Sequence, residues 1–396
     1  MTETPLRSRL GVLFLVVFIN LAGFGVLVPI FPFFGTLVGA TPGETTLAMA
    51  AYSLGQLIGS PLWGKVSDRI GRRPVLLWSL FGSLVSYAVM AFSTDIVTLG
   101  LARLFGGLMA GNIAAAFAYA GDVTTPAERP KALGLIGAAF GLGFILGPAI
   151  GGIVAGQNPD LGDFADVCMV AGAITLVAVF AVLRWLPESL TPERRALAPA
   201  IAPKAGEVLA AKPLLGALMM LTLLVIGSAA MMESTFAFLA HDSFGWGPRD
   251  VGLSFGLVGI IAAGLQGGAA GPLNRRFGAG ATMTLGIAIY VVGLAAIGLA
   301  PTSATLIAAL ALTAVGVGLF NPAFQTIVTA QSDDGDRGLV NGLTQGGSSL
   351  GRVIGPAVSG SIYAGVGMTA PFLGGAGLML VALALSAWVW TRARGA

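Results

Sequence analysis

Twelve apolar segments of roughly 20 residues follow one another along almost the whole chain, and they constrain its fold more than any other feature. A helix needs about 20 apolar residues to cross the roughly 30 Å hydrocarbon core of a bilayer. The segments lack the alternation of polar and apolar residues that a membrane β-barrel requires. We therefore predict an all-α membrane protein with twelve transmembrane helices. The predicted spans are residues 10–34, 46–64, 74–94, 97–120, 131–155, 165–186, 213–240, 249–271, 280–300, 303–329, 338–364 and 370–391.

The composition indicates a chain that is surrounded by lipid. Of its 396 residues, 56% are hydrophobic and 10% are charged, whereas about 25% of the residues of a soluble domain are charged. The first apolar segment is too long for the h-region of a signal peptide, so we expect an uncleaved helix. Basic residues fall in short loops rather than on one face, which argues against nucleic-acid binding. The single cysteine, Cys168, excludes an intramolecular disulfide.

Lysine and arginine are distributed unevenly between the two sets of loops. If the N-terminus lies inside, 18 of the 21 basic residues fall on the inner side. Arg249 is then outside, while Arg103 and Arg352 lie within spans. Because short cytoplasmic loops carry the excess of basic residues, both termini are predicted to be cytoplasmic.

A polar, proline-rich stretch divides the spans into two sets of six. We predict six-helix bundles at residues 1–187 and 212–396, joined by a cytoplasmic linker at 188–211. A pattern of residues in the first half recurs 208 positions later in the second. The first copy is Arg129, Gly134, Gly143, Gly147, Pro148 and Gly152, and the second is Arg337, Gly342, Gly351, Gly355, Pro356 and Gly360. Two repeated bundles are typical of a transporter whose halves rock about a shared site.

The segment from Gly64 to Pro74 holds five charges between two apolar runs, so we expect a short charged loop at a membrane surface. It resembles the loop between helices two and three of the Major Facilitator Superfamily. Two further motifs resemble the helix-four and helix-five motifs of that family, and the likeness covers essentially the whole chain. The first motif is Gly64, Asp68, Arg69, Gly71, Arg72 and Arg73. The helix-four motif is Arg103, Gly106, Gly107 and Gly111, and the antiporter motif of helix five is Gly141, Gly143, Gly147, Pro148, Gly151 and Gly152.

Within that family the chain is similar to the twelve-helix drug/proton antiporters, particularly the tetracycline efflux branch. The resemblance implies two pseudo-symmetric six-helix bundles in a monomer of the bacterial cytoplasmic (inner) membrane. It implies a proton-coupled antiporter that exports hydrophobic or amphiphilic drugs by alternating access, driven by the proton gradient without a bound cofactor. That branch carries membrane aspartates where this chain has Asn20, Ser86 and Tyr290, so a weakly polar drug fits better than a metal chelate. The alternatives are export of a sugar, amphiphile or siderophore, and a receptor that binds its ligand without moving it.

The resemblance assigns a conformational latch to the charged motif, with Asp68 bonding across to the other half near the start of helix eleven. A helix N-terminus attracts carboxylates, and such a contact would bias a two-state equilibrium by a few kcal/mol. The alternative is a solvated loop whose cations only set the topology. The weaker echo at Gly271–Gly278 keeps both glycines and two arginines but has no aspartate.

Three charged residues lie more than five residues from either end of a span. Glu233 is expected to face the bundle interior, because charge at that depth is costly, and to carry the proton or contact substrate. Hydration near the outer interface is the alternative. The resemblance favours a role for Arg103 in proton coupling or in positioning polar groups, and the alternative is a side chain that extends to the membrane interface. Arg352 needs an acceptor, a cavity or an anionic substrate group.

Polar and aromatic residues within the helices are candidates for a substrate cavity, although hydrogen bonds between helices explain most polar ones equally well. The candidates are Asn20, Phe24, Gln56, Asn112, Glu233, Phe236, Gln266, Asn321, Gln325 and Arg352. The hydrolase-like pattern Gly347-Ser348-Ser349-Leu350-Gly351 lies inside a predicted helix, so it does not form the strand–turn–helix of a nucleophile elbow. With no ATP-binding or metal-binding motif either, we expect a transporter and not an enzyme.

Overall fold

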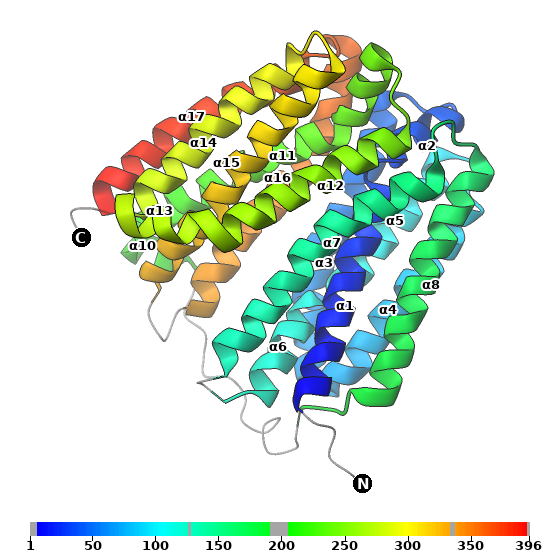
Figure 1. The fold of residues 1–396 in the computed structure, drawn as a ribbon. Coiled ribbons are helices and arrows are strands. Elements are labelled where there is room, and N and C mark those ends of the chain that lie inside the picture. The colour runs from blue at the N-terminus through cyan, green and yellow to red at the C-terminus, as the bar shows by residue number, and fades with distance from the viewer. Residues whose placement is uncertain (1–5, 126–127, 191–204, 333–336, 394–396) are drawn as a thin grey trace. The chain divides into compact units, whose positions relative to one another are not determined.

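The structure is a computed structural model of the chain, and it describes residues 6–125, 128–190, 205–332 and 337–393. Over these residues every regular element is a helix and none is a strand (Figure 1). The predicted all-α membrane fold is therefore confirmed. The helices group into two compact units, one of Met1–Ala198 with Trp246–Gly256 and the other of Pro199–Gly245 with Leu257–Ala396.

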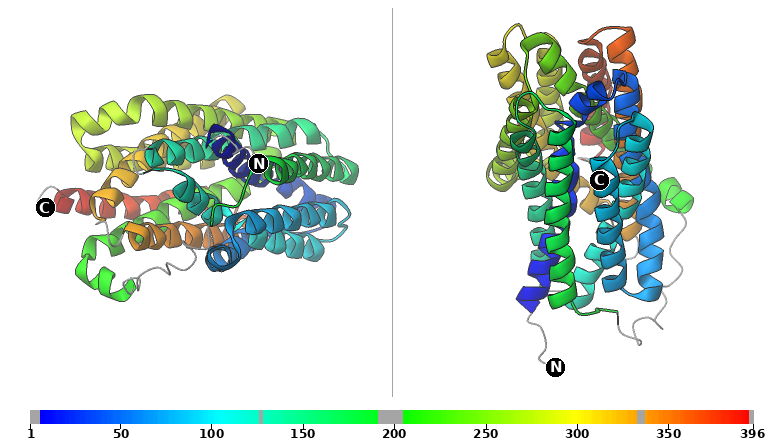
Figure 2. Two further views of the ribbon diagram at one scale, coloured as in Figure 1. Left: turned by 90° about the horizontal axis from the view of Figure 1, so that it is seen from below. Right: turned by 90° about the vertical axis from the view of Figure 1, so that its right-hand side faces the viewer.

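Unit 1 contains eight helices among the residues that the structure describes. They are α1 (Leu6–Leu27), α2 (Phe31–Leu37), α3 (Pro42–Ile70), α4 (Arg72–Ala91), α5 (Ile96–Ala110), α6 (Ile113–Val123), α7 (Arg129–Ala155) and α8 (Leu161–Trp185). The long helices pair as α1 with α7, α3 with α5, and α4 with α8, and they run roughly side by side in both views of Figure 2. Buried residues of α1, α4, α6, α7 and α8 form one apolar core.

Unit 2 is built around two helix pairs, α11 with α16 and α14 with α15, and α17 packs on both α11 and α14. Its elements are α10 (Ala205–Ala211), α11 (Pro213–Phe244), η1 (Leu265–Ala269), α13 (Ala270–Phe277), α14 (Ala279–Gly298), α15 (Ser303–Ala330), α16 (Arg337–Gly365) and α17 (Ala370–Ala393). Helix α12 (Pro248–Gly264) begins in unit 1 and continues into unit 2, where the π-helical turn η1 follows it.

The helices match the predicted spans, with corrections at their ends. Ten stretches among the described residues are long and apolar enough to cross a membrane, and α3 and α16, of 29 residues each, complete the twelve. The span predicted at 97–120 is interrupted at Gly111 and Asn112, between α5 and α6. The span predicted at 10–34 ends earlier, because α2 forms a separate short helix.

Local sequence explains where several helices begin. Thr41, Asp95, Asp160 and Thr302 each accept a backbone N–H from the first turn of the helix that follows. Such N-caps satisfy donors that the helix itself leaves unpaired and contribute about 1 kcal/mol each. The boundaries of α3, α5, α8 and α15 are thus encoded in neighbouring residues.

Candidate functional site

The charged stretch at Gly64–Pro74 is almost entirely helical, so the prediction of a loop there is wrong. Helix α3 continues to Ile70 and α4 begins at Arg72, which leaves Gly71 as the single non-helical residue between them. Gly71 has a φ of 113°, a left-handed value that glycine adopts without steric cost. A Cβ there would also overlap the Glu188 carboxylate. The sharp turn therefore requires glycine.

Arg72 is the centre of a charge network at this turn. Its Nη1 donates to the Asp68 carboxylate and, at 2.8 Å, to Ser67 Oγ, while its Nε donates to Asp122 Oδ2 at 3.2 Å. The Arg72 side chain is 9% exposed, against 18% for Asp122 and 59% for Asp68. The network joins the end of α3, the start of α4 and the end of α6.

Glu188, directly after α8, caps the N-terminus of α4. Its carboxylate accepts the backbone N–H groups of Arg72 at 2.9 Å and of Arg73 at 3.0 Å, where the helix has unpaired donors and the positive end of its dipole. The neighbouring Ser189 Oγ donates to Asp122 Oδ2 at 3.0 Å. The sequence analysis missed Asp122 and Glu188. The only available signal was a carboxylate close to the end of a predicted span.

The other predicted latch residues lie in the helices on either side of Gly71. Gly64 and the exposed Arg69 belong to the last turns of α3, and Arg73 Nη2 donates to the carbonyl of Leu183 at 2.9 Å. We expected the partner of Asp68 at the N-terminal end of helix eleven, which corresponds to α16 of unit 2, and that contact stays a prediction. Within unit 1, Asp68 pairs with Arg72.

Arg103 on α5 is buried inside unit 1, with 2% of its surface exposed. The alternative that its side chain reaches the interface is therefore wrong. Its guanidinium lies 4.5 Å from the ring centroid of Tyr52, 5.4 Å from that of Phe31 and 5.6 Å from that of Phe24. Its Nε has no hydrogen-bond acceptor among the described residues. A buried cation is thus held by three aromatic rings.

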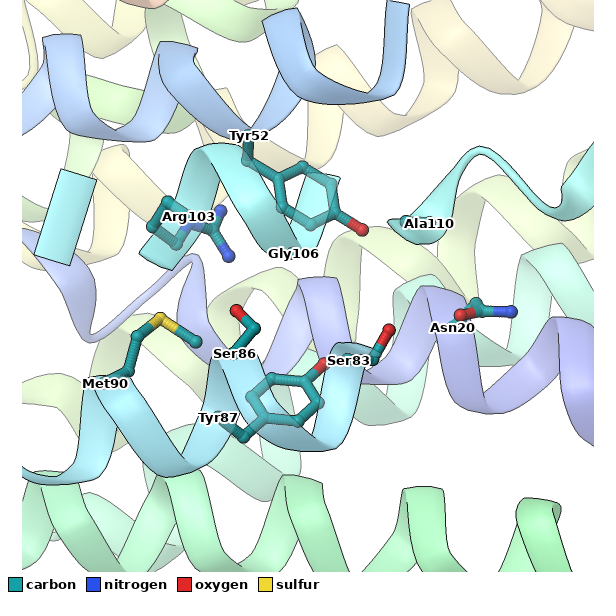
Figure 3. A pocket seen from close by; sticks show the side chains of 9 residues that line it. All are labelled: Asn20, Tyr52, Ser83, Ser86, Tyr87, Met90, Arg103, Gly106 and Ala110. Atoms are coloured by element: carbon teal, nitrogen blue, oxygen red, sulfur yellow. The ribbon is translucent and has the colours of Figure 1, made fainter. Parts of the chain in front are cut away.

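A small cavity adjoins Arg103 (Figure 3). Side chains from α1, α3, α4 and α5 line it, and the group consists of hydroxyls, an amide, a thioether and small residues beside the arginine. The lining residues are Asn20, Tyr52, Ser83, Ser86, Tyr87, Met90, Arg103, Gly106 and Ala110. Helices α3 and α5 can approach closely here because Gly107 has no side chain. A Cβ at that position would overlap the Tyr52 carbonyl oxygen.

Two of the predicted cavity residues, Asn20 and Asn112, form a buried hydrogen-bonded chain. Asn20 Nδ2 donates to Asn112 Oδ1 at 3.1 Å, and Asn112 Nδ2 donates to Ser79 Oγ at 2.6 Å. Asn112 lies at the interruption between α5 and α6. The chain links α1, α4 and that interruption, so both asparagines join helices, and Asn20 also lines the Arg103 cavity.

In unit 2, Glu233 on α11 and Arg352 on α16 form an ion pair. Arg352 Nη1 lies 4.0 Å from Glu233 Oε2, and their side chains are 28% and 30% exposed, respectively. The sequence indicated that Arg352 needs a partner but did not identify it. The helices approach closely because Gly227 of α11 lies against Gly351 of α16. Beside the pair, Ser234 and Ser359 share a hydrogen bond of 2.8 Å.

The remaining cavity candidates are dispersed. Phe24 contacts the rings of Tyr52 and Phe144 in unit 1, and Phe236 is fully buried on α11. In unit 2, the exposed Gln325 donates to Asn341 Oδ1 at 3.2 Å. Gln56 on α3 and Asn321 on α15 are half-buried, and Gln266 is exposed on η1.

The predicted antiporter motif of α7 packs helices together. A Cβ at Gly143, Gly147 or Gly151 would strike α1, and one at Gly152 would strike the Gly252 region of α12. The small residues of this motif therefore allow the helices to approach closely. Beyond the end of α7, Gln157 Nε2 donates to Asp250 Oδ1 at 3.1 Å.

Comparisons with known proteins agree with these observations. The model of the Major Facilitator Superfamily matches residues 13–270 and 267–396. The tetracycline resistance protein, class C, of Escherichia coli is 29% identical over 95% of this chain and 96% of its own length. Major facilitator superfamily domain-containing protein 10 of Mus musculus is 30% identical over 83% of this chain and 73% of its own. The crystal structure of the human organic anion transporter MFSD10 (TETRAN) is similar with a TM-score of 0.70 and 27% identity, over 97% of this chain and 100% of that one.

Proposed function

The chain belongs to the Major Facilitator Superfamily and is a multi-pass membrane transporter of small molecules, and we propose that it exports hydrophobic or amphiphilic drugs in exchange for protons by alternating access. The similarity to a tetracycline resistance protein supports drug export. The excess of basic residues in one set of loops favours an orientation with both termini in the cytoplasm, and the similarity to an Escherichia coli protein supports a bacterial cytoplasmic membrane.

The Glu233–Arg352 pair is the observation that carries the proton coupling. A charge-assisted N–H···O bond is ordinarily about 2.7–2.9 Å long, whereas these atoms are 4.0 Å apart. Roughly a third of each side chain is exposed, so the pair is not enclosed by unit 2, and we propose that a proton reaches the carboxylate from this side. We assign the proton site to Glu233 and the role of its counter-charge to Arg352.

Exchange follows from competition at this carboxylate. The ionised Glu233 attracts Arg352 and a hydrogen-bond donor or cation of the drug, whereas the protonated form attracts neither strongly. A proton arriving from one side therefore favours release of the drug, and loss of that proton favours the next binding event. A ligand shifts a conformational equilibrium only by its differential affinity for the two states, and this alternation supplies such a difference.

We assign the latch to the turn at Gly71. The pairing of Arg72 with Asp68 and Asp122 fixes one arrangement of α3, α4 and α6. Asp68 is the most exposed member, so it is the carboxylate free to exchange partners during the cycle. Arg103 supplies a fixed positive charge in unit 1, which supports coupling without itself exchanging a proton.

The test is a proton-flux assay on the purified protein in proteoliposomes. A pH gradient is imposed, a trapped dye reports internal pH, and drugs and metabolites are added one at a time. We expect at least one hydrophobic or amphiphilic drug to accelerate dissipation of the gradient, relative to protein-free liposomes. Absence of drug-dependent proton movement across the whole panel contradicts the proposal.

Export of a metabolite, specifically an organic anion, is the second candidate function. One solved relative is named an organic anion transporter, and Arg103 has no carboxylate within ion-pair distance among the described residues. The same assay separates the two candidates if organic carboxylates are included in the panel. Flux driven by carboxylates and not by neutral or cationic drugs favours the second.

A further inference from the structure

We infer that the Arg103 cavity of unit 1 is an anion site, which takes one small anionic group such as chloride or the carboxylate of a cargo molecule. The site stands on the geometry of unit 1 alone. Only its identification with part of the cargo rests on the proposed transport function.

The first step is the permanent charge of Arg103. An arginine side chain does not lose its proton in a protein, so burial cannot make it neutral. Its helix is part of a membrane span, where an uncompensated charge is costly. In the described part of the chain, Arg72 and Arg352 have carboxylate partners, whereas Arg103 has none. Its counter-charge is therefore not supplied by the described residues, and we assign it to a bound anion.

The second step is the way in which the guanidinium is held. Three aromatic rings lie 4.5–5.6 Å from it and fix its position through cation–π attraction. The rings attract the positive charge electrostatically, but they do not provide hydrogen-bond acceptors in the plane of the guanidinium. Its Nε has no acceptor among the described residues. This fork of donors matches the geometry of a carboxylate. The donors are thus oriented before any ligand arrives.

The third step is the lining of the cavity. It contains no aspartate or glutamate, and its polar atoms belong to neutral side chains. Figure 3 shows the guanidinium directed toward the space between the Tyr52 ring and the Ser86 hydroxyl. The cavity measures about 10 Å³, room for about one water molecule. Such a space suits one group of about this size, such as a chloride ion or one oxygen of a carboxylate, and sulfate, with four oxygens and a double charge, serves as the bulkier comparison ion.

The test uses the purified full-length protein in detergent, without any pH gradient. Thermal unfolding is followed while chloride, or in a second arm acetate, replaces sulfate at constant ionic strength. A ligand that binds only the folded state raises the midpoint with the logarithm of its concentration above Kd. We expect such a rise for the wild-type protein and its loss in Arg103→Gln. Arg184→Gln removes an exposed arginine of α8 and should keep the rise.

A second variant keeps the proposal testable if Arg103→Gln fails to fold. Ser86→Asp places a carboxylate beside the guanidinium and should supply the missing counter-charge internally. The Ser86 hydroxyl donates to the Ala102 carbonyl at 2.7 Å, and an ionised aspartate cannot make that bond, so the readout is the anion response and not the unfolding temperature itself. We expect Ser86→Asp to have lost the response to chloride and acetate. An undiminished response in Ser86→Asp contradicts the site.

The two arms identify the source of the anion. Saturation by chloride at the expense of acetate indicates a free inorganic anion, and preference for acetate indicates a cargo carboxylate. No saturable response to either anion, or equal responses in the wild type and Arg103→Gln, overturns the proposal. Because nothing is transported in this experiment, its result is independent of whether the protein exchanges drugs for protons.

Discussion

Arg103 and Arg352 are both arginines within membrane helices, but the structure surrounds them differently. Arg352 lies 4.0 Å from Glu233 and is 28% exposed. Arg103 is 2% exposed, faces three aromatic rings and has no carboxylate partner among the described residues. A guanidinium does not titrate in a protein, whereas a carboxylate does. The charge of the site in unit 2 therefore depends on a proton, and that of the site in unit 1 does not.

This difference suggests a division of roles between the two units. The pair in unit 2 changes its net charge when Glu233 gains a proton, so it is suited to couple transport to a pH gradient. The isolated cation of unit 1 is suited to bind something, because its charge is constant. The predictions below test the division, from the largest expected effect to the smallest.

Removal of the titrating group should have the largest effect. Glu233→Gln keeps the shape of the side chain but cannot exchange a proton, so drug-driven proton flux in proteoliposomes should be lost. Coupling between two sites ordinarily amounts to about 5- to 150-fold, and we expect a decrease in that range. Asp166→Asn, at an exposed carboxylate of α8, should transport normally. Wild-type flux in Glu233→Gln would remove that residue from the mechanism.

Removal of the fixed charge should lower transport without changing its pH dependence. Arg103→Gln should reduce the transport rate about tenfold, equivalent to roughly 1.4 kcal/mol, with the midpoint of the pH–rate profile unchanged. Arg103→Lys keeps the charge and should recover part of the rate. A shifted midpoint in either variant would show that Arg103 takes part directly in proton exchange. It would contradict the distinction between a fixed charge in unit 1 and a titrating pair in unit 2.

The two members of the unit 2 pair should differ in their effect on stability. Glu233→Gln leaves Arg352 charged, whereas Arg352→Gln leaves a carboxyl group that can become neutral by binding a proton. We therefore expect Glu233→Gln to be the more destabilising by about 1 kcal/mol, since partial exposure reduces the cost found for buried pairs. Thermal unfolding in detergent measures which of the two variants is less stable. The double variant should have an unfolding midpoint closer to that of the wild type than Glu233→Gln has. The reverse order would contradict this reading.

A third arginine, Arg72, has two carboxylate partners and gives the smallest expected effects. Asp122 is 18% exposed and Asp68 is 59% exposed, so Asp122→Asn should lower the unfolding midpoint more than Asp68→Asn does. The difference should be about 0.5 kcal/mol, since exposed ion pairs contribute about 0.2–1 kcal/mol. Asp68→Asn should instead affect the transport rate, if that carboxylate acts as the latch. Equal losses of stability in the two variants would contradict the assignment of a structural role to Asp122 and of a latch role to Asp68.

Much of the fold could be predicted because its signals are local. Twenty apolar residues in a row specify a membrane helix whatever surrounds them, and caps such as Thr41 and Asp160 lie next to the helices that they start. The repeated glycines at Gly143 and Gly351 indicated two related halves, and the structure shows that both lie where helices contact each other closely. The prediction of a loop at Gly64–Pro74 was wrong because charge alone does not end a helix. The left-handed turn at Gly71 does so.

The candidate sites could be predicted only in part, because their members are distant in the sequence. The charged motif was visible, but Asp122 lies 50 residues and Glu188 lies 116 residues from Arg72. The sequence showed that Arg352 needs a counter-charge but did not show which carboxylate supplies it. For Arg103, interfacial and buried positions could not be distinguished, since both are open to an arginine near a helix end.

The sequence by itself determined that this chain spans a membrane with twelve helices in two related halves, since hydrophobic length acts within each segment and the repeat can be seen directly by comparing the two halves of the chain. Only the tertiary structure decided that Glu233 neutralises Arg352 and that aromatic rings surround Arg103. Those outcomes depend on which helix faces pack together. Helix packing is set by the shapes of side chains from distant segments, and no local pattern contains that information.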